Sequence, residues 1–152
     1  MAIHQIIQHQ EIKGSLSEVW NFFSNPRNLQ TITPDYMDFR ITSGELPTDI
    51  YPGQIITYSV SPIAGIPLFW MSEIKQVIPF KMFIDEQRKG PYKLWHHEHR
   101  FEEQNGMVRM TDIVHYQLPY WLFGELAGNV FIKKQLSRIF EFRKKKVMDL
   151  FP

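Results

Sequence analysis

The residues best suited to chemistry lie in one short stretch of the chain. Trp95, His97, His99 and Phe101 alternate with polar residues, so on a β-strand they would share one face. Two histidines at positions i and i+2 of a strand lie about 7 Å apart along it. A carboxylate on the neighbouring strand could hydrogen-bond one imidazole, fix its tautomer and favour its charged form. This stretch is therefore a candidate for acid–base chemistry or ligand binding.

The turn that follows the histidines indicates where such a carboxylate comes from. Asn105-Gly106 suits a two-residue type I′ turn. If these two residues form the loop, Gln104 faces Met107, and His99 lies directly opposite Asp112. The inward residues of the second strand are then Met110, Asp112, Val114 and Tyr116.

The other face of the same hairpin is polar and supports this register. Glu102 lies opposite Arg109, and we expect a cross-strand ion pair between them. A slip of one residue would mix the polar and apolar faces, which favours the proposed pairing.

The cluster of His97, His99 and Asp112 is open to several interpretations. It could be a buried polar network that satisfies its own hydrogen bonds and holds the sheet together. It could anchor a ligand, or it could act as general acid and base on a ligand carbonyl or hydroxyl. Two histidines and a carboxylate also suit Fe(II) or Zn(II), but a His-x-His pair alone is a weak signal. We expect no metal and no other cofactor.

Three more polar residues could join this cluster. Asp85 and Gln87 sit two apart on an expected strand, so they share a face and could extend the polar patch. Arg143 falls inside the apolar face of the last helical pattern. It either extends to water or pairs with an inward carboxylate, Asp85 or Asp112. We favour a structural Arg–Asp pair that joins the helix to the sheet.

The elements that position these residues follow from turn signals and periodicity. A strand over Ile3–Ile12 precedes two short helices, Leu16–Phe23 and Pro26–Leu29, and the first begins with a capping box at Ser15. Leu122–Phe151 is a long helical pattern. Between them we expect six strands, at Met37–Thr42, Gln54–Ser61, Leu68–Val77, Lys81–Arg88, Tyr92–Glu103 and Met107–Leu118.

The long helical pattern has one apolar and one basic side. The apolar residues that share an arc are Ile132, Leu136, Ile139, Val147 and Leu150. The opposite side carries Lys133, Lys134, Ser137, Arg138, Glu141, Lys144 and Lys145. A solvated helix face accounts for these charges without a nucleic-acid partner.

Composition narrows the function classes. The 152 residues include no cysteine, which excludes disulfides, thiolate metal sites and cysteine nucleophiles, and fits a reducing compartment. The formal net charge of +1 gives no bias toward nucleic acid. No signal-peptide pattern or membrane-spanning apolar run is present, so we expect a cytoplasmic protein with no integral membrane segment. The aromatic fraction of 14% indicates either a large core or a lined cavity.

One apolar segment stands apart from these elements. Residues 62–70, Pro62 to Trp70, form an apolar hairpin tip bracketed by prolines. It is either a loop packed on the body of the protein, or a cavity lid or partner contact.

The chain resembles a bacterial subgroup of the SRPBCC (START/Bet v 1-like) superfamily, whose members include polyketide cyclase/dehydrase-like ligand-binding proteins. The resemblance spans the chain and rests on the element order and on one motif. The motif runs Asp85-x-Gln87-x-x-Gly90-Pro91-x-x-x-Trp95-x-His97-x-His99-x-Phe101, continues as Thr111-Asp112-x-Val114-x-Tyr116-x-Leu118-Pro119, and closes with Ile139-Phe140-x-x-Arg143.

This resemblance implies an α+β helix-grip fold over a single domain, residues 1–152. A curved seven-stranded antiparallel sheet would wrap round the long C-terminal helix, with two short helices after the first strand and a hydrophobic cavity inside. Members of the superfamily bind lipids, sterols, polyketides or quinones. Some catalyse cyclisation or dehydration, and others serve as protein-interaction domains.

We therefore expect the chain to bind a small hydrophobic molecule in an internal cavity. A cyclase, dehydratase or isomerase that uses His97, His99 and Asp112 for proton transfer is the first alternative, and a protein-interaction module is the second. The expected ligand-binding residues are Asp85, Gln87, Trp95, His97, His99, Phe101, Asp112, Val114, Tyr116 and Arg143.

Overall fold

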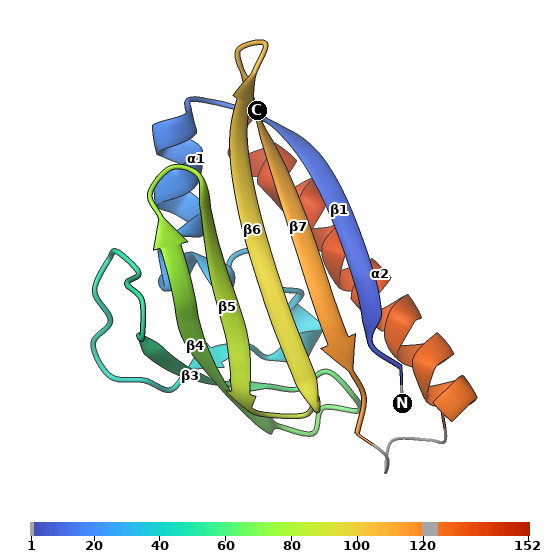
Figure 1. Cartoon of the computed structure of the whole chain (residues 1–152). Coiled ribbons are helices and arrows are strands. Elements are labelled where there is room, and N and C mark those ends of the chain that lie inside the picture. The colour runs from blue at the N-terminus through green and yellow to red at the C-terminus, as the bar shows by residue number, and fades with distance from the viewer. Residues whose placement is uncertain (1, 120–124) are drawn as a thin grey trace.

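A computed structural model describes residues 2–119 and 125–152 and has one antiparallel sheet with a long helix across one face (Figure 1). The strand order is β1-β7-β6-β5-β4-β3-β2. The strands are β1 (His4–Lys13), β2 (Arg40–Ile41), β3 (Ile55–Val60), β4 (Leu68–Ile78), β5 (Met82–Lys89), β6 (Leu94–Gln104) and β7 (Met107–Gln117). The helices are α1 (Leu16–Phe23) and α2 (Glu125–Leu150), with short 3₁₀ turns η1 (Pro26–Leu29) and η2 (Asp35–Met37). This is the expected helix-grip fold.

Strand limits agree closely with the sequence prediction except at β2. The predicted strand Met37–Thr42 shrinks to Arg40–Ile41 because η2 occupies its first residue. Asp38 then adopts a left-handed conformation, φ 44°, which a continuous strand does not allow. The predicted helix Leu122–Phe151 is present as α2, and its first three residues lie outside the described part of the chain.

Helix α1 begins with the predicted capping box. Ser15 Oγ accepts a hydrogen bond from the Glu18 N–H, and Glu18 Oε2 accepts one from the Ser15 N–H, at 3.2 and 2.9 Å. Each bond satisfies a backbone donor that has no partner within the helix. The cap fixes the start of the helix, which turns Val19 and Trp20 into the core.

The β6–β7 hairpin has the predicted turn and register. Asn105 and Gly106 have φ angles of 52° and 74°, as a type I′ turn requires. Gln104 pairs with Met107 and His99 pairs with Asp112. Along both strands the inward residues are buried and alternate with more exposed ones.

The prediction of an ion pair between Glu102 and Arg109 on the outer face of this hairpin is wrong. Arg109 lies opposite Glu102 on β6, but it also lies opposite Glu11 on β1, the other neighbour of β7. Its Nε atom is 3.3 Å from Glu11 Oε1, so the arginine uses the acid on β1.

Helix α2 packs its apolar side on the sheet, with one change from the prediction. Ile132, Leu136 and Val147 are buried, whereas Leu150 at the end of the helix is 41% exposed. Phe140, which is not among the predicted apolar residues, is buried and packs with Trp95 and Tyr116 in one core cluster. The predicted basic side of the helix is exposed.

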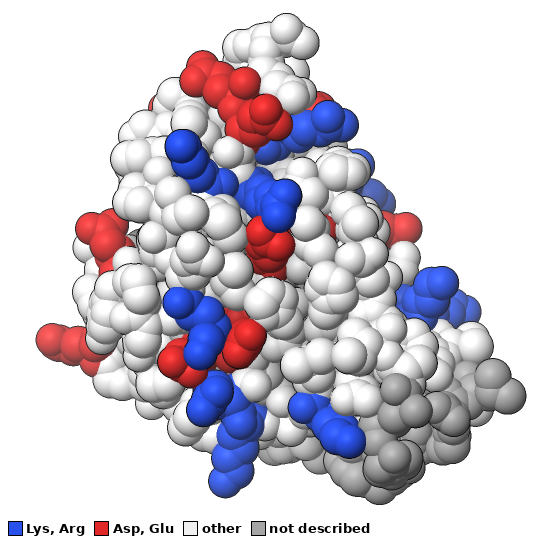
Figure 2. All heavy atoms as spheres, in the orientation of Figure 1, with Lys and Arg blue, Asp and Glu red and all other residues white. Residues whose placement is uncertain are grey.

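The outer surface of the sheet carries charges of both signs. Figure 2 shows Lys and Arg side chains interspersed with Asp and Glu over this face. This mixed pattern accords with the formal net charge of +1. Within residues 2–119 and 125–152, no helix combines the length and apolarity needed to cross a bilayer.

The turn geometry yields a stability prediction. Gly106→Ala should lower the free energy of unfolding by about 1 kcal/mol, because a side chain makes the left-handed conformation costly. Gly44→Ala is the matched control: a Cβ there also meets nothing within 4 Å, and the residue has no positive φ. Denaturant unfolding of both variants measures the difference, and equal stabilities would contradict the argument.

Candidate functional site

A cavity of about 460 Å³ lies between the sheet and α2. This volume is within the range of roughly 300–1,000 Å³ that small-molecule sites occupy. Most of its wall is apolar, supplied by β3 to β6, α2 and the segments after α1. The carboxylate, imidazole and guanidinium groups that line it belong to Asp85, His97, His99 and Arg143.

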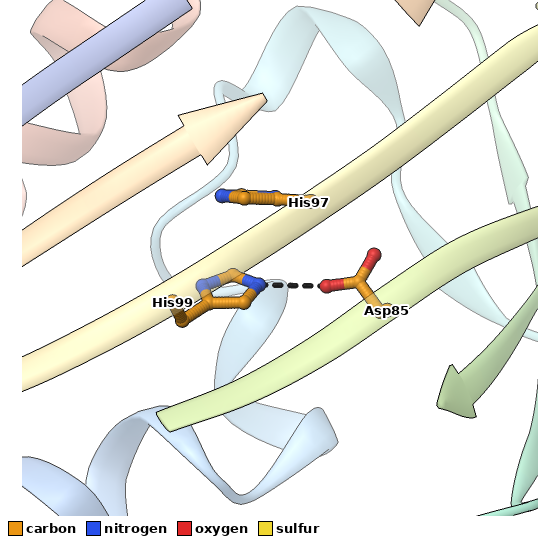
Figure 3. Close-up of side chains that lie close together, drawn as sticks. All are labelled: Asp85, His97 and His99. Atoms are coloured by element: carbon orange, nitrogen blue, oxygen red, sulfur yellow. Dashed lines mark hydrogen bonds and ion pairs between the residues drawn. The ribbon is translucent and has the colours of Figure 1, made fainter. Parts of the chain in front are cut away.

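Two histidines and two carboxylates form a crossed hydrogen-bond network beside this cavity. His97 Nε2 donates to Asp112 Oδ1 at 2.7 Å. His99 Nε2 donates to Asp85 Oδ2 at 2.6 Å (Figure 3). In the strand register, however, Asp112 lies opposite His99 and Asp85 lies opposite His97. Each carboxylate therefore bonds the histidine diagonal to it, a distance that side chains on neighbouring strands can span.

The sequence predicts that a carboxylate on the neighbouring strand can bond one imidazole. Asp112 does so with His97, and Asp85 adds a second bond to His99. His99 does lie opposite Asp112, but its Nδ1 is 3.2 Å from Asp112 Oδ1 without the geometry of a hydrogen bond. Asp85, predicted to extend the polar patch, instead supplies the acceptor for His99. The network thus joins β5, β6 and β7.

Stacking holds the two imidazoles in place. The ring centroids of His97 and His99 are 3.7 Å apart, and His99 also stacks on Phe83 at 4.1 Å. His97 and His99 are only 5% and 8% exposed. Carboxylate bonds on one side and stacked rings on the other leave each imidazole little freedom to reorient.

The network separates the protonation behaviour of the two histidines. Burial lowers the pKa of His97, and the neighbouring His99 lowers it further. Burial also disfavours charge on His99, but the carboxylates of Asp112 and Asp85 outweigh burial and raise its pKa. Burial alone would raise the pKa of both carboxyls, yet the two histidines lower the pKa of Asp85 and of Asp112. The arrangement favours two carboxylates, and it favours a proton on His99 over a second proton on His97.

Arg143 reaches the cavity from α2 but does not form the predicted Arg–Asp pair. No carboxylate oxygen of the described residues lies within 4.0 Å of its guanidinium nitrogens, and its buried Nε has no hydrogen-bond partner. Burial lowers the pKa of Arg143, and the charges of Asp112 and Asp85 oppose that effect from a distance. The prediction of a structural Arg–Asp pair between the helix and the sheet is therefore wrong, and the guanidinium lines the cavity.

A second polar group on the cavity wall was missed by the sequence reasoning. Tyr58 Oη lies 2.5 Å from Ser72 Oγ, and Trp70 Nε1 donates to the same Ser72 oxygen at 3.0 Å. All three line the cavity. Trp70 and Ser72 are two residues apart on one strand, which indicates that they share a face. A single serine among aromatic residues does not by itself predict a polar site.

Gln87 belongs to a turn and is not part of the cavity wall. Its side-chain amide donates to the Tyr92 carbonyl at 2.7 Å and its Oε1 accepts from the Tyr92 N–H at 3.1 Å. A Cβ on Gly90 would come within 2.5 Å of Gln87 Oε1, so glycine leaves room for this clamp. These two motif residues close the β5–β6 turn.

The other predicted ligand-binding residues divide into two groups. Trp95 lines the cavity together with the two histidines, Asp85 and Arg143. Phe101, Asp112, Val114 and Tyr116 are buried behind that wall, and Asp112 reaches the site only through the histidines. Segment 62–70 contributes Pro62, Ile63, Ile66, Leu68 and Trp70 to the wall.

The same segment also exposes apolar surface. Ile66 is 58% exposed and Phe69 is 47% exposed. Gln135 of α2 donates a hydrogen bond to the Pro62 carbonyl and attaches the start of the segment to the helix. The segment is thus an edge of the cavity, and its contact with a partner stays a prediction.

Asp85, His97 and His99 are the described residues whose donor atoms could surround a metal ion. These atoms lie within 4.8 Å of one another. His99 Nε2 is already hydrogen-bonded to Asp85, and His97 Nε2 to Asp112. A metal bound at these Nε2 atoms would have to replace both bonds, so in this arrangement the donor set fits a hydrogen-bonded network better than a metal centre.

The fold recurs in solved structures of other proteins. Protein CV1439 from Chromobacterium violaceum is 11% identical, with a TM-score of 0.73 over 97% of each chain. Protein Ms6760 from Mycobacterium smegmatis is 16% identical, with a TM-score of 0.69 over 99% of this chain and 96% of that one. Major latex-like protein 151 from Panax ginseng, a Bet v 1-like protein, is 13% identical, with a TM-score of 0.57 over 91% and 95%. At these identities the likeness shows the helix-grip fold alone.

Comparison by sequence adds no family or relative. No family model matches the chain, and no curated protein matches it.

The network predicts an order of titration. As pH rises, His97 should lose its proton before His99, because the carboxylates of Asp85 and Asp112 outweigh burial at His99 but not at His97. NMR of histidine ring nuclei measures both. Asp85→Asn should lower the pKa of His99 by removing one of those charges, and a His97 that keeps its proton to higher pH than His99 would contradict the assignment.

Proposed function

We propose that this chain binds a small hydrophobic molecule, such as a lipid, polyketide or quinone, in the cavity between the sheet and α2. The observation that carries the proposal is the cavity itself. Protein interiors pack with few voids larger than a water molecule, so an apolar space of about 460 Å³ is unexpected in a plain core. Its acidic and basic groups are those of the crossed network and Arg143, which would orient a ligand by one end.

The fold supports binding in general, and it does not choose the ligand. Bet v 1-like structures share the architecture, and unrelated functions occupy shared folds. Membership of the SRPBCC superfamily and of the subgroup with the His97-x-His99 motif is part of the same proposal.

The residues that would anchor the ligand are those whose side chains line the cavity. Trp95, His97, His99, Asp85 and Arg143 line the cavity and would contact the ligand. The buried side chains behind them would act by holding that wall in shape.

A second candidate is an enzyme of the cyclase, dehydratase or isomerase type. The observation in its favour is that the pKa values of His97 and His99 move in opposite directions on the cavity wall, since such groups are suited to act as base and acid. Asp112 would hold His97 in the tautomer that carries its proton on Nε2. If the protein is an enzyme, His99→Asn should abolish turnover and preserve the affinity for the substrate. If it only binds its ligand, replacing His99 should weaken the retention of that ligand.

Filling the cavity should abolish binding. Ile139→Trp places an indole into the space from α2 and should weaken the binding of a neutral apolar fluorophore, N-phenyl-1-naphthylamine, by about tenfold or more. Fluorescence titration measures the affinity, and native mass spectrometry of protein isolated gently from its own host identifies what co-purifies.

The control for this experiment lies on the same helix. Val130→Trp adds the same ring at a position that is 69% exposed and should leave the affinity unchanged. Equal affinities for the wild type and both folded variants would show that the cavity is not the binding site.

A further inference from the structure

Arg143 is the charged group of the cavity wall that lacks a direct partner. Its guanidinium has no carboxylate oxygen within 4.0 Å among the described residues, and its Nε is buried without a hydrogen bond. The other charged groups of the wall are paired, His99 with Asp85 and His97 with Asp112. A buried donor without an acceptor costs free energy, so this position is incomplete.

Packing holds the guanidinium at the cavity while leaving its edge free. Its central carbon lies 5.5 Å from the centroid of the Phe140 ring, one turn earlier on α2. Asp85 and Asp112 attract it across the gap without accepting its hydrogens. An arginine placed in this way presents a planar set of N–H groups, which match the two oxygens of a carboxylate.

A second donor faces the same space. Trp70 donates its N–H to Ser72 Oγ, and Ser72 and Tyr58 share one further hydrogen bond between their hydroxyls. That bond uses one of the two hydroxyl hydrogens, so either Tyr58 or Ser72 keeps a hydrogen to donate. Burial raises the pKa of Tyr58, and the nearby Arg143 guanidinium partly opposes that rise. The wall therefore offers free donors from both the sheet and the helix.

Resting on the proposed function, we infer that the ligand is an amphiphile whose carboxylate binds Arg143 while its apolar part fills the rest of the cavity. The carboxylate of Asp85 does not compete for this role, because it already accepts from His99. A ligand with a cationic head group would leave the arginine without a partner and add a like charge beside it.

Three probes with the same alkyl chain test this inference. Dodecanoate, dodecanol and dodecylamine are titrated into the whole protein by isothermal calorimetry at pH 7. We expect dodecanoate to bind at least about tenfold more tightly than dodecanol, the size of a charge-assisted hydrogen bond, and dodecylamine to bind most weakly. Equal affinities for dodecanoate and dodecanol would overturn the inference.

Substitution of Arg143 assigns the preference to this residue. Arg143→Met should remove the advantage of dodecanoate over dodecanol, and circular dichroism checks that the variant folds. Arg143→Lys should recover part of the advantage, because it keeps the charge and loses the planar set of donors. Arg138→Met removes an exposed arginine from the same helix and should keep the full preference. A preference that survives Arg143→Met, or disappears in Arg138→Met, would overturn the inference.

The outcomes separate this inference from the proposed function. Binding of dodecanol without any preference for dodecanoate refutes the carboxylate and supports the cavity as a binding site. Absence of binding by all three probes refutes the proposed function, and the inference fails with it.

Discussion

The constraint on which this structure depends is the burial of two carboxylates in the middle of a sheet. Ionised Asp85 and Asp112 need hydrogen-bond donors there, because an unpaired buried charge is costly. His97 and His99 supply them in a crossed pattern that ties β5 and β7 to β6. The pattern requires the β6–β7 register in which both histidines face inward, and the Asn105-Gly106 turn sets that register.

The polar network also explains why the interior is divided. On one side of it, Trp20 of α1 packs with Phe83 and Phe101. On the other, Trp95 packs with residues of α2, including Ile132. The inner face between these clusters carries imidazoles and carboxylates that an apolar helix side chain could not satisfy. The sheet and α2 therefore do not close into one continuous core, and the cavity lies between them.

Short-range rules predicted much of this fold, and longer-range contacts account for the failures. The Asn-Gly turn and strict alternation were enough to derive the hairpin register and its inward histidines, because both act within a few residues. Which carboxylate each histidine bonds depends on how strand β5 is placed, and no local pattern contains that information. Gln87 alternates with Asp85 as a cavity residue would, yet the turn that follows it takes its side chain.

The wrong prediction for Arg143 shows how the helix, the sheet and the cavity are related. A direct pair with Asp85 or Asp112 would require the guanidinium and a carboxylate to meet within 4.0 Å across the space between α2 and the sheet. That contact would occupy the space with protein atoms and shrink the cavity. The unpaired arginine and the cavity are therefore two aspects of one arrangement: the helix carries a cation, the sheet carries two carboxylates hydrogen-bonded to histidines, and the cavity separates them. In the proposed function, a ligand that accepts the arginine's hydrogen bonds would also fill the cavity, so one feature would provide both affinity and orientation.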